Sequence, residues 1–410
     1  MEENSKYKKN AINYIPRLLE TEIKHTLKRG KSALLFGARQ TGKTTLLKEG
    51  IKPDLFYSFA NIELRQRYEK NPVAFAHELE AELVIAKHKK LVAIDEIQKI
   101  PIIFDVVQDL IDRNLAQFIL TGSSARKLKY GKANLLPGRV VTFTLHPLMT
   151  DEIPAPQPTI EKLLLYGALP GVFREPSTDD QELDLNTYVK TYLEEEIRAE
   201  AIVRNIGMFA RFLELAANEA GNLINFSKLA SVIGIQRKSI ASYYQILEDC
   251  LIAEKIEPLA IKKTRRKLSQ ALKYLFFDLG VRRLCANEGQ QLAANTLGNL
   301  FEQFVGLELI RHASVTANKF KVHYWRDHAG PEIDYVLTCG ENYVPIEVKW
   351  TDFPTSTDCR HLNIFLTEYS NTTRGFIVCR TPKKMLLTPK ILAIPWQEIG
   401  SVINELFANP

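Results

Sequence analysis

The chain has 410 residues, of which 45% are hydrophobic and 25% charged, a composition that is typical of folded globular proteins and excludes a disordered or fibrous one. At roughly 150 residues per domain, this length predicts two or three domains. Lys and Arg number 54 against 48 Asp and Glu, so the net charge is +6, which permits a polyanionic partner without requiring one.

Cysteine usage and hydropathy indicate the compartment. The five cysteines are odd in number and widely spaced, which favours neither a disulfide framework nor a zinc site and indicates a reducing, cytoplasmic location. They are Cys250, Cys285, Cys339, Cys359 and Cys379. The amino-terminal MEENSKYKKN lacks the apolar core of a signal peptide, and no apolar run is long enough to predict a membrane span.

Strands alternate with helices over the first 150 residues, which predicts a parallel α/β sheet. Short apolar runs of the kind that form buried parallel strands lie at 32–36, 91–94, 118–120 and 140–145. Helical patterns lie at about 14–26, 72–88 and 102–113. The proline-rich segment 147–158 is typical of a linker or a turn-rich domain boundary.

The rest of the chain divides into a helical part and a mixed part. Residues 160 to about 260 have helical periodicity, and the charge run KKTRRK follows at 262–267. Strands are then predicted at 274–277, 322–325, 333–337, 344–348, 376–379 and 391–394, with a long helix at 297–312. We therefore expect three domains, at 1–150, 151–285 and 286–410.

The strongest motif follows the first strand and fits G-x-x-x-x-G-K-[ST], the phosphate-binding loop. Its residues, the candidate ATP-binding set, are Gly37, Ala38, Arg39, Gln40, Thr41, Gly42, Lys43, Thr44 and the adjoining Thr45. The glycines let backbone N–H groups curl around phosphates, Lys43 reaches the β and γ phosphates, and the Thr44 hydroxyl binds Mg²⁺. A helix that begins near Lys43 adds the positive end of its dipole.

Two carboxylates come directly after the apolar run 91–94. Mg²⁺ bound to a nucleotide needs a carboxylate in its surroundings, and Asp95 is the candidate. Glu96 is the candidate catalytic residue that polarises the attacking water. ATP and Mg²⁺ are thus the expected cofactors.

Other candidates for the reaction follow the later strands. Ser123 or Ser124 has the position to lie between the γ phosphate and the water, although a plain turn fits the same residues. Arg139 precedes the strand at 140–145 and has two interpretations, an arginine finger for a neighbouring subunit or a surface salt bridge. Arg126 is the reserve finger candidate.

Residues 225–247 have the pattern of a helix-turn-helix. A first helix capped at Ser227 ends at Gly234, and a second begins near Gln236 with Ile240, Tyr244 and Leu247 on its apolar face. The candidate DNA contacts are Arg237 and Lys238, together with a wing over 251–267 that carries Lys262, Lys263, Arg265, Arg266 and Lys267. A protein-binding module and a solvated basic face fit the same pattern.

The C-terminal part has charged residues within its apolar elements. Glu302 lies on the long helix, Asp334 lies in one strand, and Glu347 and Lys349 share one face of the next. Two carboxylates can hold Mg²⁺ while a nearby lysine positions a water. The alternative is a structural ion pair of Lys349 with Asp334 or Glu347.

Segment 31–148 resembles the AAA+ ATPases, in particular a bacterial and archaeal group with a winged-helix segment and a C-terminal nuclease-like domain. The stretches that carry the resemblance include LLFGARQTGKTTLL, LVAIDEIQKIP, ILTGSS, LLPGRV, LLLYGALPGVF, GNLFEQFVGLEL and PEIDYVL with PIEVKW. The last part resembles the restriction-endonuclease-like fold, in which Asp334, Glu347, Lys349 and Glu302 match the site. The resemblance implies an AAA+ P-loop domain, a helical and winged-helix middle domain, and an α/β endonuclease-like domain.

Three functions compete on this pattern. The first is an oligomeric ATPase, with the hexamer common among AAA+ rings, that acts on duplex or branched DNA as a motor or remodeller. The second is a nucleotide-switched scaffold whose winged helix binds protein. The third is an ATP-controlled, metal-dependent nuclease that uses Glu347 and Lys349.

Overall fold

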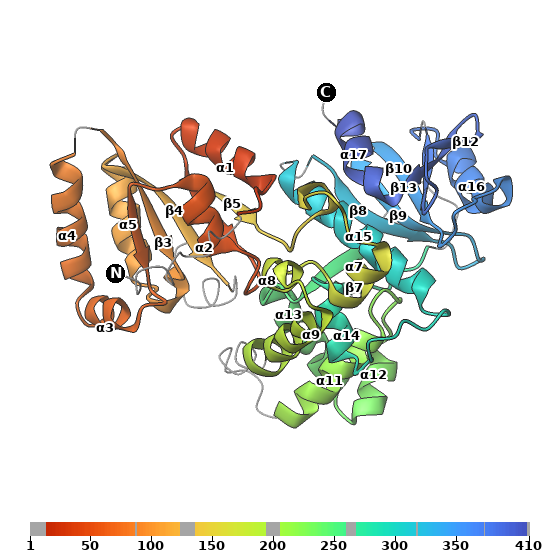
Figure 1. The fold of residues 1–410 in the computed structure, drawn as a ribbon, viewed down its shortest axis with the longest axis horizontal. Helices are drawn as coiled ribbons and strands as arrows, with labels where there is room; N and C mark the ends of the chain where they lie inside the picture. The colour runs from red at the N-terminus through yellow and green to blue at the C-terminus, as the bar shows by residue number, and fades with distance from the viewer. Residues whose placement is uncertain are drawn as a thin grey trace, which may run out of the picture.

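The computed structural model describes residues 14–86, 88–123, 136–193, 206–259, 268–316, 319–372 and 374–407. Its strands form two sheets, one of five strands and one of eight, and a helical unit packs beside the larger sheet (Figure 1). None of the helices in these ranges is long and apolar enough to cross a membrane.

The N-terminal sheet is parallel throughout, with the order β2-β3-β4-β1-β5. Its strands are β1 (Ser32–Phe36), β2 (Leu55–Ser58), β3 (Lys90–Asp95), β4 (Ala116–Gly122) and β5 (Val140–Thr144). The four strands predicted from apolar runs are confirmed. Sequence reasoning missed β2, because this edge strand has only four residues, all of them half-buried.

Helices cover both faces of this sheet (Figure 1). Ala33 and Leu35 of β1 pack with α1 (Leu19–Lys28) and with the helical segment that follows the phosphate-binding loop. That segment is α2 (Lys43–Thr45), continued by a π-helical turn, Leu46–Ile51. The alternate residues Leu34 and Phe36 face the other core. It involves α3 (Ile62–Lys70), α4 (Pro72–Val84), the 3₁₀ turn Ile97–Lys99 and α5 (Ile103–Asp112).

The proline-rich connection after β5 is turn-rich but not a solvated linker. It holds a 3₁₀ turn, Thr150–Glu152, and the side chains of Leu148, Met149 and Ile153 are buried. Leu148 and Ile153 belong to the apolar core of the second sheet, so this segment packs the N-terminal domain against that sheet.

A helical unit follows, and its core is rich in aromatic rings. Its elements are α7 (Ile160–Tyr166), α8 (Pro170–Arg174), α9 (Thr178–Thr187), a π-helix (Tyr188–Leu193), α11 (Ile206–Asn218), α12 (Phe226–Ile233), α13 (Arg237–Asp249) and α14 (Leu279–Cys285). Tyr244 of α13 stacks on Tyr274 with ring centroids 4.3 Å apart and meets Phe212 of α11 edge-on. The buried positions Ile240, Tyr244 and Leu247 confirm the predicted apolar face.

The predicted cap of α12 was wrong by two residues. The Asn225 side chain accepts hydrogen bonds from the backbone N–H groups of Ser227 and Lys228, at 3.1 and 3.0 Å. Ser227 therefore lies inside the first turn, and Asn225 is the cap because its side-chain oxygen lies just before the helix and accepts from two free N–H groups at once.

The second sheet has the order β12-β13-β11-β10-β9-β8-β6-β7. Its strands are β6 (Ala253–Pro258), β7 (Lys273–Phe276), β8 (Lys321–Arg326), β9 (Glu332–Cys339), β10 (Asn342–Val348), β11 (Gly375–Cys379), β12 (Met385–Thr388) and β13 (Ile391–Pro395). All six predicted strands are present. Sequence reasoning missed β12, and β6 lies where the predicted helical stretch, to about residue 260, overlaps the predicted wing at 251–267.

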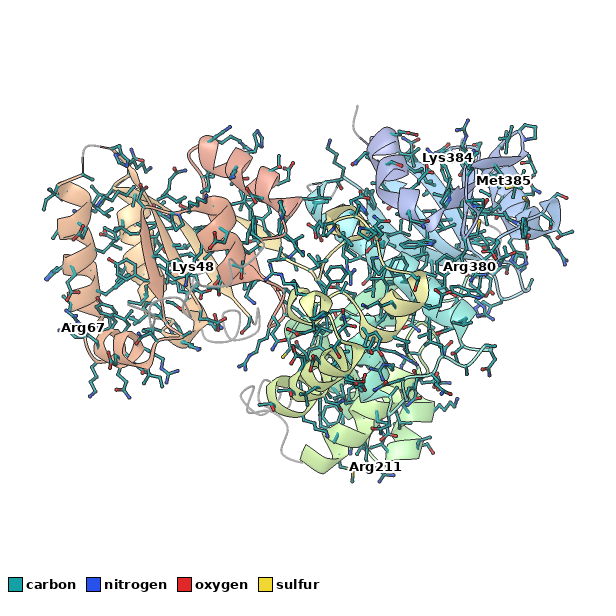
Figure 2. The ribbon with its side chains drawn as sticks, in the orientation of Figure 1. Lys48, Arg67, Arg211, Arg380, Lys384 and Met385 are labelled. Carbon is teal, nitrogen blue, oxygen red and sulfur yellow. The ribbon has the colours of Figure 1, made fainter. Side chains whose placement is uncertain are left out.

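Helices also cover both faces of the second sheet (Figure 1). One face carries α15 (Leu297–Val315) and α17 (Ile399–Phe407). A 3₁₀ turn, Trp396–Glu398, comes directly before α17. The other carries α16 (Arg360–Glu368) after the 3₁₀ turn Ser356–Cys359. Arg380 joins this sheet to α7, because its guanidinium lies 4.0 Å from the Trp350 ring and within 3.5 Å of Glu161 (Figure 2).

Strand β6 connects the hairpin that follows α13 to the C-terminal sheet. It pairs antiparallel with β7, and its last residues, Glu257 and Pro258, pair parallel with β8. The hairpin that follows α13 is therefore continuous with the C-terminal sheet.

Candidate functional site

The phosphate-binding loop leaves the carboxyl end of β1, between β4 and β5. A side chain at Gly37 would place its Cβ 2.6 Å from the Leu145 carbonyl oxygen, and Gly42 has a φ of +95°, so both positions require glycine. The Lys43 ammonium is buried and donates to the carbonyls of Gly37 and Ala38, at 2.8 and 2.9 Å. The loop thus holds a cation inside its own curve, where a phosphate group would bind.

The carboxyl end of β3 brings Asp95 to the same edge of the sheet. Asp95 is buried and its carboxylate accepts hydrogen bonds from three hydroxyls: Thr44 at 3.0 Å, Ser58 at 3.1 Å and Thr121 at 2.6 Å. Since a hydroxyl and a carboxylate are oxygen ligands that suit Mg²⁺, the Thr44–Asp95 pair fits the ion that accompanies a nucleotide. Sequence reasoning predicted this pair but not Ser58 or Thr121.

Glu96 is held by residues that sequence reasoning missed. Its backbone is left-handed, with φ of 60°, and its N–H donates to the Thr121 hydroxyl at 3.1 Å. The Gln98 amide donates to both the Glu96 carboxylate, at 2.7 Å, and the Ser123 hydroxyl, at 3.0 Å. Gln98 therefore bridges two of the predicted catalytic residues. Ser124, the other serine candidate, lies outside the described residues.

A cavity of about 520 Å³ opens beside the loop. Its walls include the predicted residues Arg39, Gln40, Gly42, Lys43, Thr44, Thr45 and Glu96. The opposite wall comes from the helical unit: Pro170, Gly171 and Arg174 of α8, and Asp184 and Thr187 of α9. Pro170 and Gly171 lie in LLLYGALPGVF, a stretch that carries the AAA+ resemblance, but sequence reasoning gave this wall no part in the nucleotide site. Glu195 and Glu196, where the resembling group usually has an Arg-Asp pair, lie outside the described residues.

Arg17 connects the loop to the segment after β5. The guanidinium of this buried residue donates to the Thr41 carbonyl at 2.9 Å, to the Glu152 carboxylate at 2.9 Å and to the His146 carbonyl at 2.7 Å. Glu152 is also buried and accepts from the N–H groups of Leu18 and Met149. These bonds hold the Thr41 part of the loop against the segment after β5. Arg17 is expected to keep all of these partners, because a buried charge without partners is costly.

Arg139 does not line the cavity of its own chain. Its guanidinium makes two hydrogen bonds to Asp112, at 2.6 and 2.8 Å, and these lower the pKa of that carboxyl. The surface salt bridge that sequence reasoning kept open is therefore present, and a finger role in a neighbouring subunit would require it to open. The reserve candidate Arg126 lies outside the described residues.

The helix-turn-helix candidate presents part of its predicted basic surface. Gln236, Arg237 and Lys238 are exposed at the start of α13. The antiparallel hairpin β6–β7 follows, and a bridge between Leu223 and Lys273 adds a third strand position to it. Lys262, Lys263, Arg265, Arg266 and Lys267 lie outside the described residues.

The four C-terminal candidates lie close together, at α15, β9 and the end of β10. Lys349 pairs with Glu347 at 2.7 Å, so the structural ion pair that sequence reasoning weighed is present. Asp334 accepts from the Val348 N–H at 2.8 Å. Glu302 pairs with Lys273 at 2.7 Å, a partner that sequence reasoning missed. Within the described ranges, no group of three or more His, Cys, Asp or Glu side chains is arranged to hold a metal ion.

Family models match all three parts of the chain. Residues 29–154 match an AAA domain, residues 157–299 match a domain of unknown function (DUF8612), and residues 297–399 match another (DUF4143). With the parallel sheet and the phosphate-binding loop, the first match makes the N-terminal domain a nucleotide-binding P-loop domain of the AAA type.

Relatives of similar length have no described activity. Uncharacterised proteins of Mycobacterium tuberculosis and Mycobacterium bovis are each 26% identical over 392 residues, which cover 94% of this chain and 85% of theirs. An uncharacterised protein of Methanocaldococcus jannaschii is 24% identical over 322 residues, 66% of either chain.

Solved structures give only weak likenesses. A STAND protein with a tetratricopeptide repeat sensor from Pyrococcus horikoshii is 11% identical with a TM-score of 0.23; the match covers 74% of this chain and 47% of that one. A protein from Vibrio cholerae is 12% identical with a TM-score of 0.21, over 92% and 97% of the two chains. Scores this low carry no argument about fold or function.

Proposed function

We propose that the protein is an ATP-hydrolysing AAA+ protein that acts on DNA as an oligomeric motor or remodeller. The observation that carries the ATPase part is the arrangement at the carboxyl edge of the first sheet. There Thr44 and Asp95 are in contact beside Lys43, and Glu96 is bridged to Ser123 by Gln98. Phosphoryl transfer depends mainly on positioned charges, and this arrangement of residues supports that chemistry.

Each residue has a distinct task in the proposed reaction. Lys43 leaves the carbonyls of Gly37 and Ala38 and binds the β and γ phosphates. Thr44 and Asp95 would hold Mg²⁺, which would supply positive charge to the phosphates of bound ATP. Glu96 orients the attacking water and takes up its proton, while Ser123 lies beside the γ phosphate. Residues of α8 and α9 form one wall of the cavity. This supports a further step, in which the exchange of ATP for ADP changes the position of the helical unit.

Steady-state ATP hydrolysis and ATP binding test this assignment with two variants. Lys43→Ala should lose both binding and hydrolysis. Glu96→Gln should bind ATP with unchanged affinity and hydrolyse it at least 100-fold more slowly, because a positioned base contributes about 10²–10⁴-fold. Glu69→Gln, an exposed glutamate of α3, is the matched control. Equal rates in Glu96→Gln and the control would refute the role of Glu96.

The DNA partner is supported by charge and by the helix-turn-helix arrangement. Arg237 and Lys238 are exposed at the amino-terminal end of α13, where a recognition helix contacts the major groove. The basic run 262–267 follows in sequence, between β6 and β7. Duplex and branched DNA are the proposed ligands, read mainly through their phosphates.

An oligomer is the proposed working form, with Arg139 completing the site of the next subunit. Mixing Arg139→Ala with Lys43→Ala protein tests this. If the finger acts between subunits, the mixture should recover hydrolysis that neither variant has alone, because one subunit supplies the nucleotide site and the other the arginine. Light scattering should first show that the two variants assemble together. If the assembled mixture does not recover ATP hydrolysis, Arg139 makes only the surface salt bridge.

The scaffold alternative uses the same ATP site with a protein partner for the α12–α13 unit. An ATPase rate that is indifferent to DNA would favour it. The nuclease alternative is supported by the succession of α15, three antiparallel strands β8–β9–β10, α16 and a parallel β11, which suits the endonuclease-like fold. The fold alone does not imply cleavage.

A further inference from the structure

We infer that Lys273 occupies the cation position of the C-terminal carboxylate cluster, so that this cluster binds no divalent metal and instead fastens the β6–β7 hairpin to α15. This inference is independent of the proposed ATPase site. It concerns the group formed by Lys273, Glu302, Asp334, Glu347 and Lys349. The endonuclease-like resemblance implies a metal here, and the described side chains do not fit one.

Lys273 reaches the cluster from a different part of the chain. It is the first residue of β7, and its backbone pairs with Ile256 of β6 and bridges to Leu223 before α12. Its side chain is only 9% exposed and its ammonium lies 2.7 Å from the Glu302 carboxylate. The contact joins β7, beside the helical unit, to α15 (Figure 1).

Aromatic rings complete the surroundings of this ammonium. The rings of Tyr335 and Tyr324 have centroids 5.4 and 5.7 Å from the nitrogen, within the range of a cation–π contact. The Tyr335 hydroxyl donates to the Glu302 backbone carbonyl at 2.9 Å, which fixes the ring to the same turn of α15. This is a site built for a buried ammonium group, not for a hydrated ion.

Two of the three carboxylates in the cluster have a lysine partner. Lys273 pairs with Glu302 and Lys349 pairs with Glu347, so the two lysines supply the two positive charges that a divalent ion would bring. The third carboxylate, Asp334, accepts a backbone hydrogen bond from Val348.

A metal ion would therefore have to displace a buried lysine. Mg²⁺ requires close to six oxygen ligands at about 2.1 Å, and the adjoining cavity, of about 160 Å³, has Lys273 itself among its walls. Displacing the lysine would leave an ammonium group buried without its carboxylate partner, which is strongly unfavourable.

Mn²⁺ binding to the full-length, nucleotide-free protein tests the inference by electron paramagnetic resonance. Wild type and Asp334→Asn should bind equal amounts of Mn²⁺, which shows that no Asp334-dependent site exists. Lys273→Met, which keeps the length and apolar stem of the side chain, should gain one site, and Lys273→Met/Asp334→Asn should lose it again. Lys255→Met, an exposed lysine of the same hairpin, is the matched control and should gain none.

Two results would overturn the inference. One is an Asp334-dependent Mn²⁺ site, or Asp334-dependent DNA cleavage, in the wild-type protein. The other is a folded Lys273→Met variant that gains no site. Hydrogen exchange gives a second readout that needs no metal: amides of β7 should exchange at least tenfold faster in Lys273→Met than in Lys255→Met, and equal rates would contradict the fastening role.

Discussion

Glu96 cannot turn freely in the structure, because Gln98 holds its carboxylate and the hydroxyl of Ser123 at the same time. The backbone of Glu96 is left-handed, and the Gln98 amide donates to its carboxylate at 2.7 Å. We assign Gln98 as a positioning residue: it acts on the water only through Glu96 and Ser123.

Gln98→Ala should lower kcat for ATP hydrolysis about ten- to a hundredfold, because one hydrogen bond to a charged group is worth about 1.5–3 kcal/mol. The KM for ATP should change less than threefold, since Gln98 does not line the cavity. Gln117→Ala, at the opposite end of β4, removes a comparable amide that bonds to the Leu27 carbonyl and should leave kcat unchanged. A loss confined to KM would contradict the assignment.

Motif spacing predicted Lys43, Thr44, Asp95 and Glu96, because phosphate and metal binding need those residue types at the carboxyl ends of parallel strands. It did not predict Arg17 or Gln98. The bond from Arg17 to Glu152 spans 135 residues and that from Gln98 to Ser123 spans 25. Contacts of this kind depend on how segments meet in space, which no local pattern encodes.

At the scale of elements, β6 and α12 show where local reading of the sequence fails. Strand β6 lies where the predicted helical stretch overlaps the predicted wing, and in the structure it pairs with β7 on one side and β8 on the other. The pairing with β8 depends on the C-terminal sheet and not on the local pattern. Helix α12 begins one residue after Asn225, although Ser227 is an equally good cap by residue type. Long elements such as α15 and β9 were predictable because their apolar patterns are long.

The assignment of Asn225 as the cap predicts that one of two alanine variants changes hydrogen exchange in α12 and the other does not. Asn225→Ala should raise the hydrogen-exchange rate of the first-turn amides of α12 by about five- to tenfold, corresponding to the loss of about 1 kcal/mol expected for an N-cap. Ser227→Ala should leave these rates within twofold of wild type. The reverse order, with Ser227→Ala the more damaging, would restore Ser227 as the cap.

At the scale of the molecule, the two lobes meet at charged groups that are largely removed from water. His146, after β5, lies 3.5 Å from Glu254 of β6, and its other ring nitrogen meets the Ser314 hydroxyl. Burial raises the pKa of Glu254 from 4.5 to about 7, with Arg311 partly opposing it. Burial, followed by the charges of Arg311 and Arg17, lowers the pKa of His146 to about 3.

These shifts predict a pH dependence for the junction. Because the pKa of Glu254 is raised on folding, its contribution to stability is present below about pH 4.5 and is lost as the pH rises through 7. Glu254→Gln should therefore be more stable than wild type at pH 8, by on the order of 2 kcal/mol after allowance for partial exposure. The gain should shrink towards zero at pH 5.

The melting temperatures of Glu254→Gln and wild type at the two pH values measure this effect. We expect the difference between them to be several degrees larger at pH 8 than at pH 5. A difference that is the same at both pH values would show that Glu254 is not buried at the junction in solution.

The rate of ATP hydrolysis with and without duplex DNA, in wild type and in Arg237→Ala/Lys238→Ala, tests the central claim most directly. The account predicts that DNA stimulates wild-type hydrolysis several-fold. It also predicts that the double variant keeps the DNA-free rate and needs more DNA for stimulation, with the salt dependence of binding reduced by about two charges. A wild-type rate that is the same with and without duplex or branched DNA would contradict a DNA-directed ATPase and favour the nucleotide-switched scaffold.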